Sequence, residues 1–109
     1  MHVHKMLDMK GGWFIGNFSP AVLKTSEFEV CYKEHKKGEQ WETHFHKLGT
    51  EYNYLAKGKM VIQGMELNAG DIFILKPNEI ADPVFLEDCS VVIVKTPSIP
   101  GDKYEVEDA

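Results

Sequence analysis

Two histidines and one glutamate near the middle of the chain have the residue types and the spacing of a metal site. His44 and His46 are separated by one residue, and Glu51 follows five residues after the second histidine. In a β-strand, residues two apart point to the same face, so the two imidazoles would converge. A short turn after His46 would then bring Glu51 back beside them. Two imidazoles and one carboxylate form a ligand set for a divalent transition metal.

Short β-strands are the elements that would position these residues. Apolar and polar residues alternate with a period of two, and Gly, Pro, Asn or Asp interrupts the pattern about every 8 to 12 residues, which is typical of an all-β sandwich or barrel. No segment has the pattern of a long helix. The predicted strands are 13–18, 27–35, 42–47, 51–57, 59–63, 65–67, 71–76, 83–87 and 90–96.

Glycines mark three of the predicted turns. Gly38, Gly58 and Gly70 each stand between two predicted strands, where a positive φ is favourable. We expect β-hairpins at these turns. The run Ile-Phe-Ile-Leu at 72–75 is apolar on both faces, so we expect it to be deeply buried.

The same residues resemble the first motif of the cupin superfamily, in which a Gly, a His-x-His pair, a Glu and a second Gly follow one another. This chain has them at Gly38, His44, His46, Glu51 and Gly58. The second cupin motif is matched in part, by the run from 70 to 77 that begins Gly-Asp and ends in Pro. The resemblance implies an all-β fold, a double-stranded β-helix or jelly-roll barrel, with a metal held by His44, His46 and Glu51.

Asp82 stands where the second cupin motif usually supplies a fourth ligand, a histidine. Three interpretations are open: a fourth ligand in a 2-His-2-carboxylate site, a general base near a metal-bound water, or a residue at the barrel mouth with neither role. As a ligand, a carboxylate would favour Mn, Fe(II) or Co over Cu, while Zn and Ni stay compatible. The expected cofactor is therefore a divalent ion of Fe, Mn, Ni, Co or Zn.

A barrel of this size is filled largely by side chains and leaves a small cavity at one mouth. Asn53 and Leu55 follow Glu51 at a spacing of two, so they should line the interior, while Tyr52 and Tyr54 face away. Asn53 is either a catalytic residue that orients a substrate or a metal-bound water, or a hydrogen-bonded core residue. Three aromatic residues are candidates for the cavity wall: Trp41, Phe73 and Phe85.

The remaining histidines and the cysteines suggest no second reactive site. His35 lies at the end of a predicted strand, and we expect it to be exposed to water. With no third barrel histidine in the middle of the chain, the sequence lacks the His–Asp general-base pair that a metal-free sugar-nucleotide epimerase would normally need. Cys31 and Cys89 belong to no CxxC pattern, so we expect two buried free thiols.

Length and charge limit the organisation and the partners. The 109 residues, 43% of them hydrophobic, predict a single domain over 1–109, with a core at about 12–97 and a loosely ordered acidic C-terminal tail. The net charge of −5 and the lack of a basic cluster argue against nucleic acid as a partner. No apolar run approaches the roughly 20 residues of a spanning helix, and no signal peptide is recognisable. We therefore predict a cytoplasmic protein without a membrane partner.

Two functions fit the site. The first is a metal-dependent enzyme with dioxygenase-like or isomerase-like chemistry on a small polar metabolite. The alternative is a non-catalytic module that binds or senses a carbohydrate or nucleotide sugar, since a small chain has few loops to form a lid. By resemblance to small cupins we also expect a homodimer, in which the strand at 91–96 and the segment 97–104 cover the barrel's edge.

Overall fold

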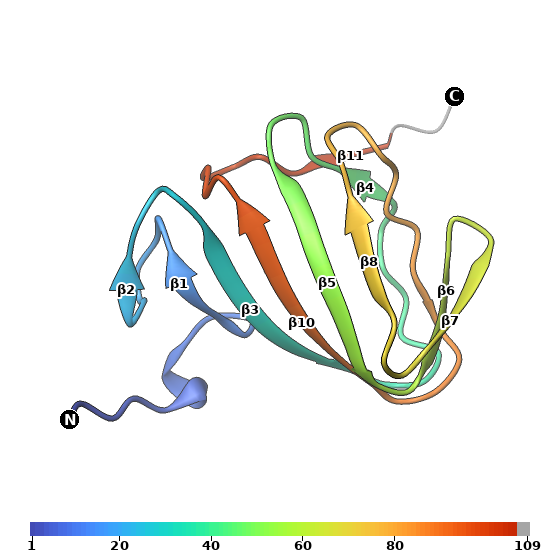
Figure 1. Ribbon diagram of the computed structural model, residues 1–109, viewed down its shortest axis with the longest axis horizontal. Coiled ribbons are helices and arrows are strands. Elements are labelled where there is room, and N and C mark those ends of the chain that lie inside the picture. Colours follow the sequence, from blue (N-terminus) through green and yellow to red (C-terminus); the bar gives the residue numbers. More distant parts are fainter. Residues whose placement is uncertain (107–109) are drawn as a thin grey trace.

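Nearly all regular structure in the computed structural model, which describes residues 1–106, is β-strand (Figure 1). The nine predicted strands are all present, with ends that differ from the prediction by no more than two residues. The short strands β2 and β11 and one 3-10 turn, η1, are additional. The elements are η1 (Met6–Asp8), β1 (Trp13–Gly16), β2 (Leu23–Lys24), β3 (Glu29–His35), β4 (His44–Phe45), β5 (Thr50–Lys57), β6 (Lys59–Ile62), β7 (Met65–Asn68), β8 (Ile72–Leu75), β9 (Val84–Phe85), β10 (Cys89–Thr96) and β11 (Tyr104–Glu105).

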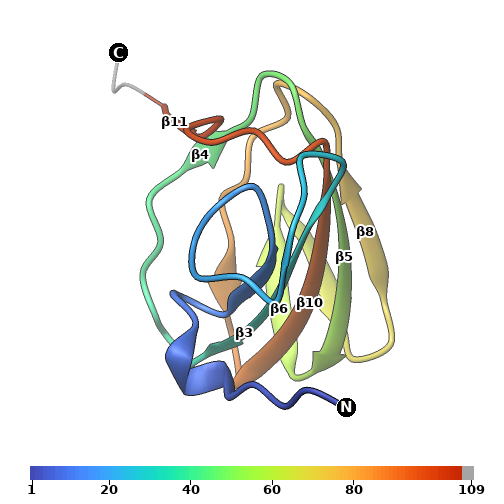
Figure 2. The same ribbon diagram turned by 90° about the vertical axis from the view of Figure 1, so that its left-hand side faces the viewer.

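The strands build a barrel from one large sheet and two small ones. The large sheet has the order β2-β1-β3-β10-β5-β8, and the small sheets are β7-β6-β9 and β11-β4. Figure 2 shows β10, β5 and β8 on one side of the molecule and β4 with β11 on the other. This is the jelly-roll arrangement that the sequence predicts. Within the described residues, no helix is long and apolar enough to cross a membrane.

The predicted glycine turns are present, but they connect sheets rather than the two strands of a hairpin. Gly38, Gly58 and Gly70 have φ values of 78°, 94° and 101°. Strand β5 pairs with β10 and β8, whereas β6 pairs with β7 and β9, so the chain changes sheet at Gly58. A Cβ at Gly58 would lie 2.3 Å from the Asp88 carbonyl oxygen, so only glycine fits there. The prediction of hairpins at these turns was wrong because turn residues do not determine which strand a segment pairs with.

The face of the large sheet that points into the barrel carries charged residues. The inward residues of β3, β10 and β5 align in rows, because the register pairs residues directly across neighbouring strands. Lys33 and His35 continue this inward face along β3. The two innermost rows are Glu29, Lys95 and Glu51, and Cys31, Ile93 and Asn53.

The opposite face of the same sheet is apolar and points outward. The prediction that 72–75 is deeply buried was wrong for this reason: Ile72 is 73% and Ile74 48% exposed, while inward-facing Leu75 is buried. Tyr52 and Tyr54 face outward as predicted. Two rows of uncharged side chains cross β3, β10, β5 and β8: Val30, Val94, Tyr52 and Ile74, then Tyr32, Val92, Tyr54 and Ile72.

The segment after β10 folds back over the barrel mouth. The Ser98 N–H donates a hydrogen bond to the Ser26 carbonyl, Asp102 is buried, and β11 pairs with β4. The described part of the predicted tail is therefore packed on its own chain rather than loosely ordered. Residues 107–109 of that tail lie outside the described residues. Strand β10 has partners on both sides, so it cannot offer the dimer edge that the sequence suggested.

The hydrophobic core lies between the sheets, and both cysteines belong to it. Cys31 and Cys89 are free thiols, 0% and 2% exposed, as predicted. Burial raises the pKa of the Cys31 thiol to about 12, so the reactive thiolate is strongly disfavoured. Neither cysteine has the exposure or the acidity of a nucleophile.

Candidate metal centre

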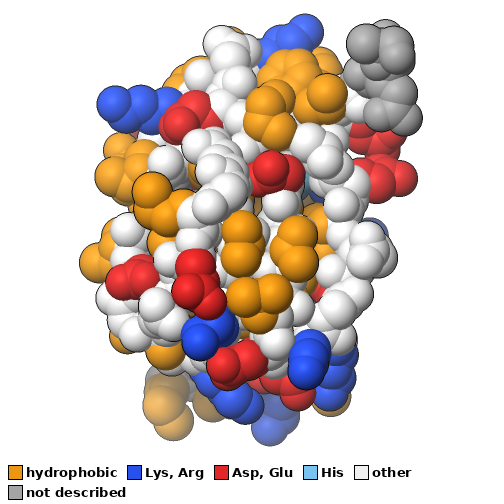
Figure 3. Space-filling model, turned by 90° about the vertical axis from the view of Figure 1, so that its right-hand side faces the viewer, with side chains coloured by type: hydrophobic (Ala, Val, Ile, Leu, Met, Phe, Trp, Pro, Cys, Tyr) orange, Lys and Arg blue, Asp and Glu red, His pale blue; other side chains and the backbone are white. Residues whose placement is uncertain are grey.

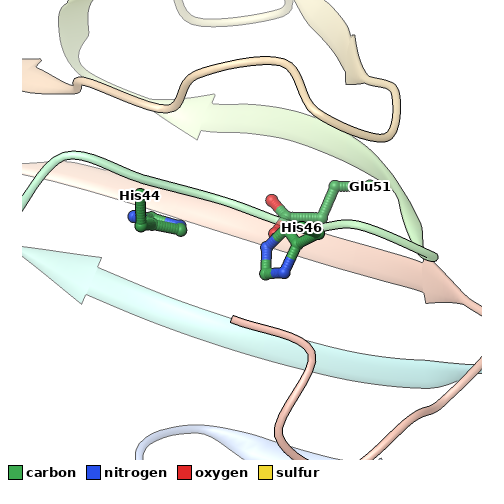
Figure 4. Close-up of side chains that lie close together, drawn as sticks. All are labelled: His44, His46 and Glu51. Atoms are coloured by element: carbon green, nitrogen blue, oxygen red, sulfur yellow. The ribbon is translucent and has the colours of Figure 1, made fainter. Parts of the chain in front are cut away.

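The three predicted ligands come together inside the barrel (Figure 4). His44 begins β4, His46 directly follows it, and Glu51 lies in β5. All three are 8% exposed, and one ligand atom from each lies within 4.8 Å of the others. Metal–ligand bonds of about 2.0–2.2 Å would span these atoms after small side-chain rotations. The cluster could therefore hold a metal ion.

Hydrogen bonds orient both imidazoles in the way that a metal site requires. His44 Nδ1 lies 3.2 Å from the Glu42 carbonyl oxygen, and His46 Nδ1 contacts the Asp102 carbonyl oxygen. Because a carbonyl only accepts hydrogen bonds, each Nδ1 carries a proton, which leaves each Nε2 as the nitrogen that could ligate a metal. Backbone carbonyls that bind the outer nitrogen of a ligand histidine are a common support for metal sites. The donor set and its supports therefore fit a divalent transition metal.

His46 and Glu51 form an ion pair at the place where a metal would bind. His46 Nε2 lies 2.7 Å from Glu51 Oε2. Burial alone would lower the pKa of His46, but the bonds to Glu51 and Asp102 outweigh it and raise that pKa. Burial alone would raise the pKa of Glu51, but the hydrogen bond and the charge of His46 outweigh burial and lower that pKa. A metal ion would replace the shared proton, because only deprotonated nitrogen and oxygen atoms ligate metals.

The pKa of His44 is shifted in the opposite direction from that of His46. Its pKa is lowered, chiefly by burial and in part by the Lys103 charge. A histidine that is neutral near pH 7 is ready to ligate a metal without first losing a proton. The cluster thus combines one neutral imidazole with one imidazole whose proton is shared with a carboxylate.

The cluster faces a cavity of about 150 Å³ in the barrel interior. Asn53 lines it as predicted, 3% exposed, and its amide donates a hydrogen bond to the Phe73 carbonyl oxygen at 3.5 Å. A hydrogen bond from Asn53 also helps to lower the pKa of Glu51. The three predicted wall residues are all present: Trp41, Phe73 and Phe85.

Comparisons place this architecture among known folds. Neither a protein-family model nor a curated protein sequence matches the chain. A Klebsiella pneumoniae protein with a double-stranded β-helix domain has 26% identity and a TM-score of 0.66, over 80% of this chain and 81% of its own. KdgF from a Halomonas species has 21% identity and a TM-score of 0.62, over 70% and 74%. A Ralstonia eutropha protein with a cupin-like fold has 15% identity and a TM-score of 0.62, and the match covers 77% of this chain and 56% of its own. The chain is a cupin by its fold.

Two enzymes are among the cupin's structural neighbours. Pac13 of Streptomyces, a nucleoside dehydratase also solved with uridine, has 15% identity and a TM-score of 0.63, over 75% of this chain and 70% of its own. Salicylate 1,2-dioxygenase of Pseudoaminobacter salicylatoxidans has 13% identity and a TM-score of 0.58, over 65% and 21%. At these identities the likeness concerns the fold alone.

Asp82 does not join the cluster in this cupin. Its carboxylate accepts a hydrogen bond from the Gln63 backbone N–H at 2.7 Å, and the residue is exposed. Ala81, not Asp82, pairs with His44 across the barrel and points inward, 4% exposed. Since successive residues of an extended chain face opposite ways, Asp82 points outward. The interpretation of Asp82 as a fourth ligand does not fit this geometry.

His35 is a cavity residue of the cupin rather than an exposed one, so that prediction was wrong. It is 7% exposed and stacks on Phe85 with ring centroids 4.1 Å apart. Its Nδ1 lies 2.5 Å from Glu39 Oε2, which also accepts a hydrogen bond from Trp41 Nε1. The barrel therefore does contain a His–carboxylate pair, contrary to the expectation from sequence. The pair fixes Trp41 on the cavity wall.

Asp102 is a positioning residue that the sequence analysis missed. Its carboxylate accepts hydrogen bonds from the backbone N–H groups of Lys47, Leu48 and Gly49, at 2.8–3.2 Å. These three residues form the turn that carries the chain from one predicted ligand to the next. Its carbonyl oxygen holds the His46 ring. In sequence, an Asp after Pro-Gly indicates only a surface turn.

Lys95 completes this support from the barrel interior. It is 5% exposed, and its Nζ lies 3.4 Å from Glu29 Oε1 and 3.8 Å from Asp102 Oδ2. A buried ammonium is tolerated when carboxylates pair with it, which is the case here. A Cβ on Gly49 would lie 2.5 Å from the Lys95 side chain, so a larger residue at this position would require Lys95 to move.

Proposed function

We propose that this cupin binds one divalent transition metal through His44, His46 and Glu51 and acts on a small polar metabolite in the adjoining cavity. The observation that supports the proposal most is the buried cluster of two imidazoles and one carboxylate, in which both Nδ1 atoms contact backbone carbonyls. Three protein ligands leave coordination positions open for a substrate. The candidate ions are Fe, Mn, Co, Ni and Zn.

The bound metal would supply Lewis acidity or an oxygen-binding position, in isomerase-like or dioxygenase-like chemistry. The protein's own residues would orient the substrate and shape the cavity. Asn53 is placed to orient a polar group of the substrate beside Glu51. The walls that include Trp41, Phe73 and Phe85 would limit the access of water to a bound substrate, which would strengthen electrostatic interactions there.

Elemental analysis of the purified protein, followed by thermal unfolding with each candidate ion, tests the proposal. Free metal at 100 times its Kd adds about 2.7 kcal/mol to stability. For a domain of this size that is a rise of roughly 10 °C or more in Tm. A protein that carries no metal, and whose Tm no candidate ion raises, would rule the metal site out.

The alternative function is binding or sensing of a carbohydrate or nucleotide sugar without turnover. The enclosed, aromatic-walled cavity suits it as well. Metal-dependent consumption of O2, or conversion of a sugar or keto acid by the loaded protein, favours the enzyme. Ligand binding with no conversion under the same conditions favours the sensor.

We also propose that a second copy of the chain covers the outward apolar face of the large sheet. Five side chains of these two rows are exposed and the other three are half-buried, so the rows form a contiguous, partly exposed apolar surface, which a soluble monomer rarely presents. Hydrophobic side chains also appear on the side that carries β6 and β7, but they are interspersed with acidic and lysine side chains (Figure 3). The face-to-face contact would replace the edge contact that the sequence suggested.

Light scattering during size-exclusion chromatography measures the molar mass of the protein in solution and so tests the dimer directly. We expect a mass of about twice 12.4 kDa for the parent protein. The double variant Tyr54→Lys, Ile72→Lys should elute as a monomer, because lysines in the centre of an apolar interface are strongly disfavoured. Met65→Lys, an exposed position on β7, is the matched control and should keep the dimer. A monomeric parent protein would refute the proposal.

A further inference from the structure

Two lysine ammonium groups from distant parts of the chain lie near the ring of one tryptophan of the cavity. Lys33 lies on the inward face of β3, and Lys103 directly precedes β11. Their Nζ atoms lie 4.9 and 5.2 Å from the ring centroid of Trp41. Both lysines line the cavity that also contains the His44, His46 and Glu51 side chains, and Lys33 is half-buried while Lys103 is exposed.

Among the described residues, these two ammonium groups lack the close carboxylate partners of the buried Lys95, although the Lys103 charge acts on the nearby Glu105 carboxylate. Lys95 lies within 4.0 Å of Glu29 and Asp102. Within residues 1–106, neither Lys33 nor Lys103 makes an ion pair with a carboxylate. The chain has a net charge of −5, so acidic partners are abundant elsewhere on it. Positive charge is thus concentrated at this cavity in an otherwise acidic protein.

Support of the Trp41 ring does not account for this arrangement. One cation over an aromatic face is a favourable contact, but a second over the same ring repels the first. The ring is already held by its Nε1 hydrogen bond to Glu39. An anion bound near both ammonium groups would offset their repulsion, and the partly enclosed cavity would strengthen that attraction relative to bulk water.

We infer that the cavity takes a small organic anion whose carboxylate is bound by Lys33 and Lys103. The chain has no arginine, so the carboxylate would be bound by two lysine ammonium groups rather than by a bidentate guanidinium. The volume of about 150 Å³ suits a molecule about the size of benzene. The rest of the molecule would lie against apolar walls that include Met60, Phe73 and Phe85. This inference deepens the proposed function by naming its substrate class.

Calorimetric titration of metal-free and metal-loaded protein with matched pairs of probes tests the inference. The pairs are acetate and acetamide, pyruvate and its amide, and benzoate and benzamide. We expect at least one carboxylate to bind about 10-fold more tightly than its neutral partner. Trp13 and Trp41 both line the cavity, so tryptophan fluorescence gives an independent readout.

Charge-removing variants assign the effect to these lysines. Lys33→Gln and Lys103→Gln should each weaken carboxylate binding by about 3- to 10-fold, the range expected for one charge-assisted contact. Lys24→Gln, an exposed lysine on β2, is the matched control and should change it little. Equal binding of acid and amide in all three pairs, or unchanged binding in both variants, would overturn the inference. Tighter lysine-dependent binding of inorganic phosphate than of any carboxylate would overturn the choice of a carboxylate.

The metal-free arm separates this inference from the metal proposal. If no metal binds but carboxylates still bind in a lysine-dependent way, the metal proposal fails and the anion site stands. If metal binds to the three ligands but the lysine variants leave carboxylate binding unchanged, the metal site stands and the anion site fails.

Discussion

Replacing His46 by alanine should lower the affinity for a divalent transition metal by at least about 100-fold, since loss of a mere supporting partner of a ligand costs about 10- to 100-fold. His46 is the centre of the cluster: Nε2 contacts Glu51 and Nδ1 contacts the Asp102 carbonyl. Alanine removes both contacts and one ligand atom. Calorimetric titration with the ion found in the native protein measures the change, and circular dichroism checks that the variant is folded.

Asp82→Ala is the control for that variant, because the sequence motif places Asp82 at a ligand position whereas the structure places it on the surface. Its carboxylate binds the Gln63 N–H on the surface, so the variant should keep metal affinity within about twofold. Loss of affinity as large as in His46→Ala would return Asp82 to the ligand set. Unchanged affinity in His46→Ala would remove His46 from it.

Asp102→Ala should destabilise the protein by about 3–5 kcal/mol, the cost of removing one partner of a buried ion pair. The turn at 47–49 loses its carboxylate acceptor, and the buried Lys95 ammonium keeps only Glu29 as a carboxylate partner. Burial opposes ionisation, but the backbone N–H groups and Lys95 lower the pKa of Asp102, so the carboxylate is charged near pH 7. Urea unfolding, monitored by fluorescence, measures the loss.

Asp71→Ala separates this effect from ordinary turn capping. Its carboxylate also accepts a backbone N–H, that of Asn68 at 2.7 Å, but in an exposed turn. We expect a loss of about 1 kcal/mol there. Equal losses in the two variants would show that the buried network of Asp102 adds nothing. Metal affinity of a folded Asp102→Ala protein should also fall, because the turn between the ligands is no longer fixed.

The sequence was sufficient to predict the clustering of His44, His46 and Glu51 and the strands, because both depend on local spacing. The side-chain period of two places His44 and His46 on one face, and alternation along β5 places Glu51 and Asn53 inside together. These relations hold whatever the strands pair with. The glycine positions of the turns were likewise visible in the sequence.

Features that depend on non-local pairing could not be predicted. Whether residue 81 or residue 82 faces His44 depends on the register across the barrel, and a shift of one residue reverses the side. The burial of Asp102 arises because a distant segment folds over the turn at 47–49.

The apolar pattern at 72–75 was misleading because the outward face of the large sheet is apolar, while its inward face combines core residues with charged ones. An apolar strand face normally indicates the core, but Tyr32 and Ile72 lie on the outside of this barrel. The inward face instead carries Lys33 and His35, which line the cavity. Such a reversal is expected where an interior is built to hold polar chemistry.

The most direct test of the metal site is anomalous diffraction, at the metal's absorption edge, from crystals of the protein loaded with the ion that elemental analysis identifies. One peak bonded to His44 Nε2, His46 Nε2 and a Glu51 carboxylate oxygen, at about 2.0–2.2 Å, is the predicted result. A peak held by other residues, or no peak at these atoms in crystals soaked with excess metal, would contradict it.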